Sequence, residues 1–243
     1  MYAINPSLDR DELAREYARR GRLQIRDFLV PESAEQIHEI LANETPWGVA
    51  YNEGTRVVQL SAGEARKLTA EQRQAISVSI SERARHGYQF FYYFFPMLEA
   101  SMTEGYPAMP LFDVLRFLNG DEFLPFVRRL TGFDAIRWAD AHATLYRAGH
   151  FLKYHTDEKP SDQRVCAYVL SFTKGWGRDW GGYLQFFNER YDVEEGLRPV
   201  FNALNIFTVP LDHSVSQVAA YAPGSRFSIT GWLRADAPPV WRR

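Results

Sequence analysis

After residue 134 the chain reads as a series of short strands, and this pattern limits its fold more than any other feature. Residues 136–146 alternate between polar and apolar, so Asp140, His142, Thr144 and Tyr146 would share one face of a strand. Similar segments follow at 151–155, 165–172, 183–187, 204–209, 215–219 and 227–233, separated by Gly, Pro and Asp. No helix-length crossover separates these segments. The pattern therefore predicts an antiparallel sandwich or barrel rather than a parallel α/β sheet.

The preceding part of the chain is predicted to be mainly helical. Helical periodicity and capping signals occur at residues 9–20, 32–41, 69–86, 111–118 and 122–130. Thr69 with Gln72 reads as a capping box, and Gly21 and Gly132 are suitable helix stops. Because the sequence contains neither a repeat nor a linker, we expect one compact α+β, mainly β domain. In it, a helical region at 1–133 would support a β core at 134–243.

Composition excludes several classes of protein. The apolar fraction of 46% is typical of a globular domain, and a net charge of −2 with scattered Arg offers no basic surface for nucleic acid. The single cysteine, Cys166, excludes a disulfide framework and a cysteine-rich zinc module. Segment 88–97 is too short and polar to span a bilayer, and residues 1–20 lack the apolar core of a signal peptide. We therefore expect a cytoplasmic protein with no nucleic-acid or membrane partner. The sequence leaves its oligomeric state open.

The tripeptide His155-Thr156-Asp157 is the sharpest candidate for chemistry. Residues i and i+2 of a strand point to the same side, so its imidazole and carboxylate would converge as two thirds of a facial metal triad. His213, at the start of a later strand, offers a third ligand. The tripeptide alone is a weak pattern, because a surface His beside a solvated Asp would look the same. Asp140-Ala141-His142 has the same spacing and is a rival metal pair.

A polar row headed by Arg226 runs along the last predicted strand. Arg226, Ser228, Thr230 and Trp232 share one face of that strand. A buried guanidinium needs a partner, and its fork of donors suits a carboxylate. A small dicarboxylate is therefore a natural ligand for Arg226. The alternative is a buried salt bridge, for which Asp140 is a candidate.

In their order and spacing, these motifs resemble those of the iron(II)- and 2-oxoglutarate-dependent dioxygenases, in particular the prolyl-4-hydroxylase-like branch. The resemblance covers about residues 134–235. Besides the tripeptide and His213 it includes Gly181-Gly182-Tyr183-Leu184, Asn205-Ile206-Phe207 and Arg226-Phe227-Ser228. It implies a double-stranded β-helix, or jelly roll, with the helical N-terminal half packed on one face.

The resemblance also implies roles for individual residues. Fe(II) would be bound by three of them: His155, Asp157 and His213. The distal carboxylate of 2-oxoglutarate would be held by three others: Arg226, Tyr146 and Ser228. Some members use a further tyrosine near the position of Tyr168, whose register is open. The implied cofactors are Fe(II), 2-oxoglutarate as co-substrate, dioxygen and, as an optional accessory, ascorbate.

The implied activity is hydroxylation of a C–H bond with release of succinate and CO2. The favoured substrate is a protein or peptide with a prolyl side chain as target, because the polar segment 158–162 and the aromatic, glycine-rich loop 176–182 would suit an extended chain. Lys153, on the strand face of His155, keeps a small metabolite as an alternative. Two other classes stay open: a non-catalytic jelly-roll module that binds a metal or carboxylate, and a zinc hydrolase with Asp140 or Glu158 as general base.

The remaining aromatic and histidine residues are interpreted as mainly structural. The stretch Tyr88–Pro96 is expected to pack the helical half against the sheet, and its alternatives are a substrate-facing wall or a dimer surface. His38, His86 and His150 are expected to be structural or loop residues. Loop 176–182 is interpreted either as a simple turn or as a mobile loop at the mouth of the site.

Overall fold

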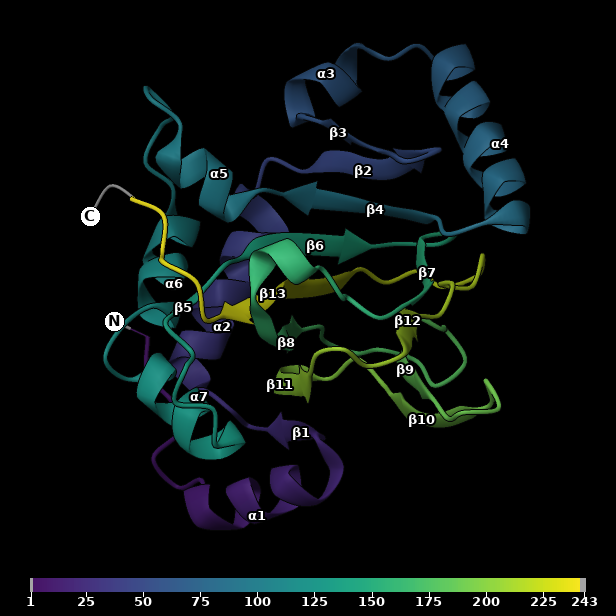
Figure 1. The fold of residues 1–243 in the computed structure, drawn as a ribbon. Helices are drawn as coiled ribbons and strands as arrows, with labels where there is room; N and C mark the ends of the chain where they lie inside the picture. The colour runs from purple at the N-terminus through teal and green to yellow at the C-terminus, as the bar shows by residue number, and fades with distance from the viewer. Residues whose placement is uncertain (1, 241–243) are drawn as a thin grey trace.

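The computed structural model describes residues 2–240, in which a strongly curved antiparallel sheet carries helices against its outer side (Figure 1). The strands are β1 (Arg22–Arg26), β2 (Gly48–Glu53), β3 (Arg56–Leu60), β4 (Phe90–Phe95), β5 (Trp138–Ala139), β6 (His142–Tyr146), β7 (Phe151–His155), β8 (Arg164–Phe172), β9 (Leu184–Phe187), β10 (Val193–Leu197), β11 (Phe201–Thr208), β12 (His213–Val215) and β13 (Arg226–Arg234). The helices are α1 (Arg10–Arg20), α2 (Pro31–Glu39), α3 (Ala62–Lys67), α4 (Ala70–His86), α5 (Met97–Met102), α6 (Pro110–Leu118) and α7 (Phe123–Thr131), with a π-helical turn at Ile40–Glu44 and a 3-10 turn at Pro160–Asp162.

The sheet curls almost into a closed barrel. Its strand order is β1-β11-β8-β13-β6-β4-β7-β12-β9-β10, with β2 and β3 branching from β4. The two end strands meet through side chains, because Arg22 on β1 donates to Glu195 on β10 (Nε–Oε2 2.8 Å) and also pairs with Glu194. This near-closed antiparallel barrel with N-terminal helices confirms the predicted double-stranded β-helix.

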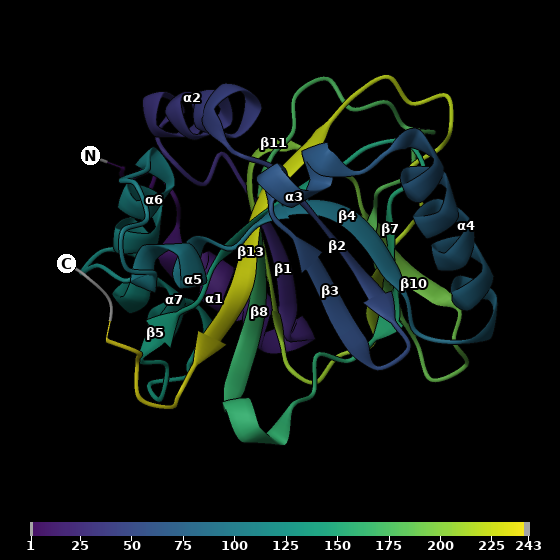
Figure 2. The ribbon, with the colours of Figure 1, turned by 90° about the horizontal axis from the view of Figure 1, so that it is seen from above.

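Helices α1, α2, α6 and α7 cover the outer side of the sheet around β1, β11, β8 and β13 (Figures 1 and 2). Helix α7 is strongly amphipathic, and its Phe126 and Val127 are buried in the main core against Phe28 and the sheet. The capping box at Thr69, the left-handed stop at Gly21 and the stop at Gly132 form as the sequence predicts. Packing of the helices on one face of the β core is thus confirmed.

The N-terminal half is not purely helical, and this corrects the expectation for residues 1–133. It contributes β1, β2, β3 and β4 to the sheet, and β10 was also not predicted. The stretch Tyr88–Pro96 contains β4, which pairs with β6 and β7 in the middle of the barrel wall. Its partners lie about 50 residues or more further along the chain, so no local sequence pattern indicates the pairing.

Helix α4 covers a different part of the sheet. Its Ile80 packs with Tyr51 and Val58 on the outer face of the β2–β3 hairpin (Figure 2). The opposite face of the hairpin looks into the barrel, where Gln59 lines a cavity. None of the helices in residues 2–240 is both long and apolar enough to cross a membrane.

Gly231 on β13 lies where two segments approach each other closely beside the barrel interior. A Cβ at Gly231 would lie 2.1 Å from the carbonyl oxygen of Asp140 and 2.6 Å from its Oδ1. Because a backbone atom is in the way, Gly231→Ala should lower the free energy of unfolding in urea by about 1–3 kcal/mol. Gly87→Ala is the matched control, since a Cβ there meets no atom within 4 Å. Equal stability of the two variants would contradict this account.

Candidate metal centre

His155 and His213 face each other across two paired strands. His155 ends β7 and His213 begins β12, and the two residues are direct partners in the antiparallel register. Their ring centroids lie 4.1 Å apart. Non-local strand pairing therefore brings together two imidazoles that are 58 positions apart in the sequence.

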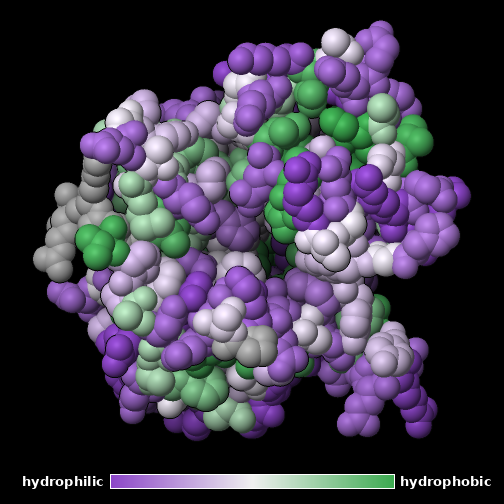
Figure 3. Space-filling model, turned by 45° about the horizontal axis from the view of Figure 1, so that its top comes forward, coloured by the Kyte–Doolittle hydropathy of each residue, from purple (hydrophilic) through white to green (hydrophobic). Residues whose placement is uncertain are grey.

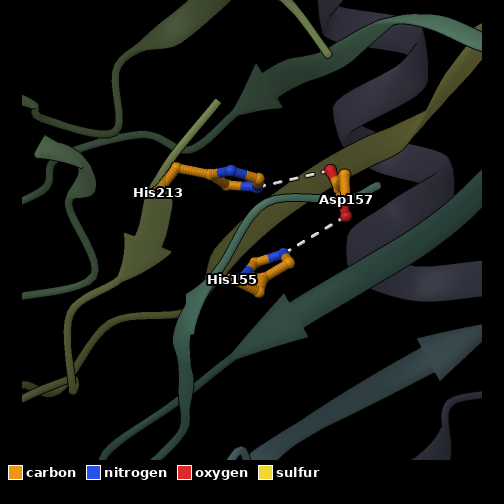
Figure 4. A group of neighbouring side chains, drawn as sticks. All are labelled: His155, Asp157 and His213. Carbon is orange, nitrogen blue, oxygen red and sulfur yellow. Dashed lines mark ion pairs between the residues drawn. The ribbon is translucent and has the colours of Figure 1, made fainter. Parts of the chain in front are cut away.

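Asp157 completes the group, although by a different local geometry from the one predicted. Strand β7 ends at His155, and Asp157 lies in the following turn with a left-handed backbone (φ 61°). An Asp tolerates this conformation better than most residues. The turn aims the carboxylate between the rings, so Nε2 of His155 lies 3.3 Å from Oδ1 and Nε2 of His213 lies 3.3 Å from Oδ2 (Figure 4).

Backbone carbonyls fix both imidazoles in the orientation that a metal ligand needs. Nδ1 of His155 donates to the carbonyl of Lys153 (2.8 Å), and Nδ1 of His213 donates to the carbonyl of Leu211 (2.7 Å). Since a carbonyl can only accept, the proton resides on Nδ1 and Nε2 is left to bind a cation. The three ligand atoms lie within 4.8 Å of one another, which is the arrangement of a facial His–Asp–His triad.

The Asp157 carboxyl is held in its charged form. Burial opposes its ionisation, but the neighbouring imidazoles of His155 and His213 outweigh burial and keep its pKa well below the usual range. An anionic oxygen beside two imidazole nitrogens is a suitable donor set for Fe(II) and for other divalent transition metals.

The triad opens into a cavity of about 1090 Å³ inside the barrel. In Figure 3 a hollow lies beneath the lobe formed by α3, α4 and the β2–β3 hairpin, and hydrophobic side chains gather beside it. The predicted co-substrate residues Arg226, Tyr146 and Ser228 all line the cavity. Arg226 pairs with Tyr146, and Ser228 with Thr144, in the β13–β6 register, so the row read from the sequence is present on the inner face.

Arg226 is buried without a counter-charge. It is 4% exposed, its guanidinium lies 4.9 Å above the ring of Tyr146, and its Nη1 donates to Ser228 Oγ (3.3 Å). Its Nε has no hydrogen-bond partner. Within residues 2–240, no carboxylate oxygen lies within 4.0 Å of its guanidinium nitrogens, the distance that defines an ion pair. A buried charge in this state needs an anion, so the residues present fit the carboxylate of 2-oxoglutarate.

Asp140 is not the partner of Arg226, which corrects the salt-bridge alternative. Asp140 Oδ1 accepts from the backbone N–H of Trp232 (2.6 Å), and Oδ2 lies 3.7 Å from Nη1 of Arg234. It does not line the cavity and is not part of the metal-ligating group, so the rival pair Asp140 and His142 is also wrong. Burial raises the pKa of Asp140 to about 7, although the Trp232 hydrogen bond and the Arg234 charge favour its ionised form.

Asp140→Asn should therefore change stability in a pH-dependent way. The carboxyl of an unfolded chain ionises near pH ~4, so between about pH 4 and pH 7 the unfolded state releases a proton that the folded state keeps, and the wild-type protein loses stability as pH rises. Asn still accepts from the Trp232 N–H but cannot ionise. Across this range the free energy of unfolding of the variant should rise relative to wild type by about 1–4 kcal/mol, measured in urea. A pH-independent difference would contradict this.

Other residues considered from the sequence lie as follows. His142 lines the cavity, and burial lowers its pKa to about 4, so it is neutral. Tyr168 is fully buried and donates to the Asp140 carbonyl (2.6 Å), on the core side of the sheet and away from the cavity. His150 is buried among aromatic rings, and His38 donates to the Phe172 carbonyl (2.8 Å), both structural as expected. His86 is exposed but lies at the cavity edge.

The aromatic stretch forms a wall of the cavity rather than only core packing. Tyr88, Phe90, Tyr92 and Phe94 all line it, which is the position that the substrate-facing alternative for this stretch requires. Loop 176–182 does not line the cavity. Trp176 packs behind Tyr146, and Gly182 lies so close to Arg226 that an added Cβ would be 3.3 Å from its Cδ, so the loop supports Arg226 from behind.

Two cavity residues had no role in the sequence-based site. Arg164 lies with its guanidinium 3.6 Å above the ring of Trp232, and its Nη1 donates to the carbonyl of Asp157 (3.2 Å). Alternation along β13 placed Trp232 on the same face as Arg226, so the sequence could have predicted that Trp232 lines the cavity. No sequence pattern predicted this for Arg164, because its position depends on the turn after Asp157.

Comparisons with known proteins agree with this geometry. A family model described as "2OG-Fe(II) oxygenase superfamily" matches residues 141–234, which contain all three ligands and Arg226. No sequence among the curated proteins matches the chain.

Several solved structures share the fold. A Pseudomonas putida prolyl-4-hydroxylase is 20% identical, with a TM-score of 0.57. The superposition covers 94% of this chain and 100% of the hydroxylase chain. An oxidoreductase of the 2OG-Fe(II) oxygenase family from Burkholderia pseudomallei is 12% identical (TM-score 0.58; 95% and 92% covered). A Trichoplax adhaerens prolyl hydroxylase, solved with a hypoxia inducible factor peptide fragment, is 16% identical (TM-score 0.55; 93% and 89% covered).

The fold and the triad together define an iron- and 2-oxoglutarate-dependent oxygenase. Residues 141–234 match the 2OG-Fe(II) oxygenase superfamily, and this match together with the His–Asp–His set implies Fe(II) and 2-oxoglutarate. The predicted superfamily and the expectation of an enzyme are confirmed.

Proposed function

We propose that this oxygenase hydroxylates a prolyl side chain of a protein or peptide. In this proposal His155, Asp157 and His213 hold the iron, while Arg226, Tyr146 and Ser228 hold the distal carboxylate of 2-oxoglutarate. Bound Fe(II) would supply the activation of dioxygen by which 2-oxoglutarate is split to succinate and CO2 as a substrate C–H bond becomes C–OH.

The protein's own residues bind and orient the co-substrate. Arg226 supplies a charged fork that no acidic group in residues 2–240 neutralises, and Ser228 steadies that fork from the same strand. Leu152, Leu184 and Val215 line the cavity with apolar surface. Such a lining excludes water and strengthens the pairing of Arg226 with a carboxylate.

The observation that carries the choice of substrate is the wall made by Trp232 and Arg164. The indole lines the cavity, and the guanidinium of Arg164, which also holds the Asp157 turn, is stacked over one face of the ring. A proline ring is rigid and apolar, so stacking it on an aromatic surface costs little entropy, and Arg164 can donate to a neighbouring peptide carbonyl. The cavity volume of about 1090 Å³ also exceeds what a small co-substrate needs.

Two further observations favour a peptide over a small metabolite. Lys153, the clamp expected for a metabolite, does not line the cavity, because its Nζ donates to the carbonyls of Ala84 and Gly87 at the end of α4 (2.6 Å each). Two of the similar structures are prolyl hydroxylases, one of them solved with a peptide. A zinc hydrolase is disfavoured because neither Asp140 nor Glu158 lines the cavity as a general base.

A peptide library provides the test. The Fe(II) enzyme is incubated with 2-oxoglutarate, air and acetylated, amidated nonapeptides that have proline at the centre and random flanks. Mass spectrometry should find peptides that gain one oxygen at proline, with succinate formed in step, and neither product with Asp157→Ala. Succinate formation without oxidation of any peptide, accompanied by oxidation of small molecules in a metabolite extract, would overturn the peptide proposal.

A further inference from the structure

Three side chains form a row across the adjacent strands β13, β6 and β4, at the end of the cavity where Arg226 lies. Arg226 on β13 is the direct partner of Tyr146 on β6. The β4–β6 register pairs Tyr93 with Leu145 and Phe94 with Thr144, so Tyr92 stands opposite Tyr146. Direct cross-strand neighbours share a face, and Arg226, Tyr146 and Tyr92 all line the cavity.

The two phenol rings of this row are stacked. Their centroids lie 5.1 Å apart with an interplanar angle of 25°. A charge on Tyr146 would raise the pKa of Tyr92 further, so the two hydroxyls lie close enough to interact. Burial raises the pKa of both phenols, so both hydroxyls stay protonated and can donate. Neither hydroxyl has a hydrogen-bond partner in the described part of the chain.

We propose that Tyr92 is a second phenol donor to the distal carboxylate of 2-oxoglutarate, beside Tyr146 and opposite Arg226; this inference rests on the proposed binding of 2-oxoglutarate. A carboxylate has about four acceptor sites, more than Arg226 and one phenol use. The unpartnered hydroxyl of Tyr92 thereby gains an acceptor, and the carboxylate gains a donor from the aromatic wall of β4. The wall thus contributes to co-substrate selection.

The test is calorimetric binding of 2-oxoglutarate to the Mn(II)-loaded protein, which does not depend on turnover. Tyr92→Phe keeps the stacked ring and removes only the hydroxyl, and it should raise the Kd for 2-oxoglutarate about tenfold, as expected for a hydrogen bond to a charged group. Tyr93→Phe is the matched control, since Tyr93 lies on the same strand but packs on His150 and does not line the cavity. Its Kd should stay within about twofold of wild type.

Oxalate, which chelates a metal but has no distal carboxylate, shows at which end Tyr92 acts. Its Kd should be the same for wild type and Tyr92→Phe. An unchanged Kd for 2-oxoglutarate in Tyr92→Phe, or an equal rise in the Kd for oxalate, would overturn the inference about Tyr92. The proposed function would still stand in that case, provided that the wild-type protein binds 2-oxoglutarate. Failure of the wild-type protein to bind 2-oxoglutarate would overturn both.

Discussion

Replacing Asp157 with alanine should abolish 2-oxoglutarate consumption and weaken Fe(II) binding by about 100-fold or more. Asp157 supplies the only carboxylate of the metal-ligating group and the only negative charge between the two Nε2 atoms, each 3.3 Å from it. Without it, only two imidazole ligands remain, which bind a divalent cation weakly. Metal content after dialysis and succinate formation are the two measurements.

Glu158→Ala is the control for the Asp157 experiment. Glu158 is the next residue, is exposed and does not line the cavity, so its variant should keep both metal and activity. This control also tests the zinc-hydrolase reading, which needs Glu158 or Asp140 as a base. Asp157→Ala protein that retains wild-type metal affinity would show that the ligand set is wrong.

Arg226→Ala should raise the Kd for 2-oxoglutarate by about 100-fold, because a charge-assisted, two-point pairing inside an apolar cavity is lost. Fe(II) binding should be nearly unchanged, since Arg226 makes no contact with the triad among the interactions of the described residues. The fold should survive, because no acidic partner within residues 2–240 is left unpaired when Arg226 is removed.

Arg147→Ala is the matched arginine control. Arg147 is close in sequence to the triad, and its guanidinium lies above the ring of Tyr93. The residue is exposed, and its Nε donates a hydrogen bond to Ser225 Oγ outside the cavity. Its removal should leave the Kd for 2-oxoglutarate unchanged. If the two arginine variants bind 2-oxoglutarate equally well, Arg226 does not hold the co-substrate.

The sequence predicted the strands that carry the chemistry because their pattern is local. Strands β7 and β13 begin within one residue of their predicted starts, and alternation along β13 correctly placed Arg226, Ser228 and Trp232 on the inner face. The order of the motifs correctly predicted that His213 lies beside His155. These elements are short and amphipathic, so side-chain periodicity alone defines them.

What the sequence did not predict depends on contacts between distant segments. The aromatic run at β4 has no alternation, so its pairing with β6 and β7, and with it the placement of Tyr92, is set only by the closed barrel. The left-handed turn at Asp157 and the stacking of Arg164 on Trp232 form just after β7 ends at His155, and the predicted end of this strand did not indicate either of them. The composition of loop 176–182 was typical of a mobile loop at the mouth of the site. Its actual packing behind Tyr146 is a contact between distant segments, which the composition does not reveal.

The most direct test of the account follows the carbon that decarboxylation would release. Purified protein is supplied with Fe(II), air and 2-oxoglutarate labelled at the carboxyl carbon next to the keto group, and labelled CO2 and succinate are measured together. Equal amounts of both products are expected, dependent on iron and dioxygen, and both should be lost when a chelator removes the metal from His155, Asp157 and His213. If metal-loaded protein leaves 2-oxoglutarate intact with every peptide and metabolite fraction tried as substrate, the protein is not a 2-oxoglutarate-dependent oxygenase.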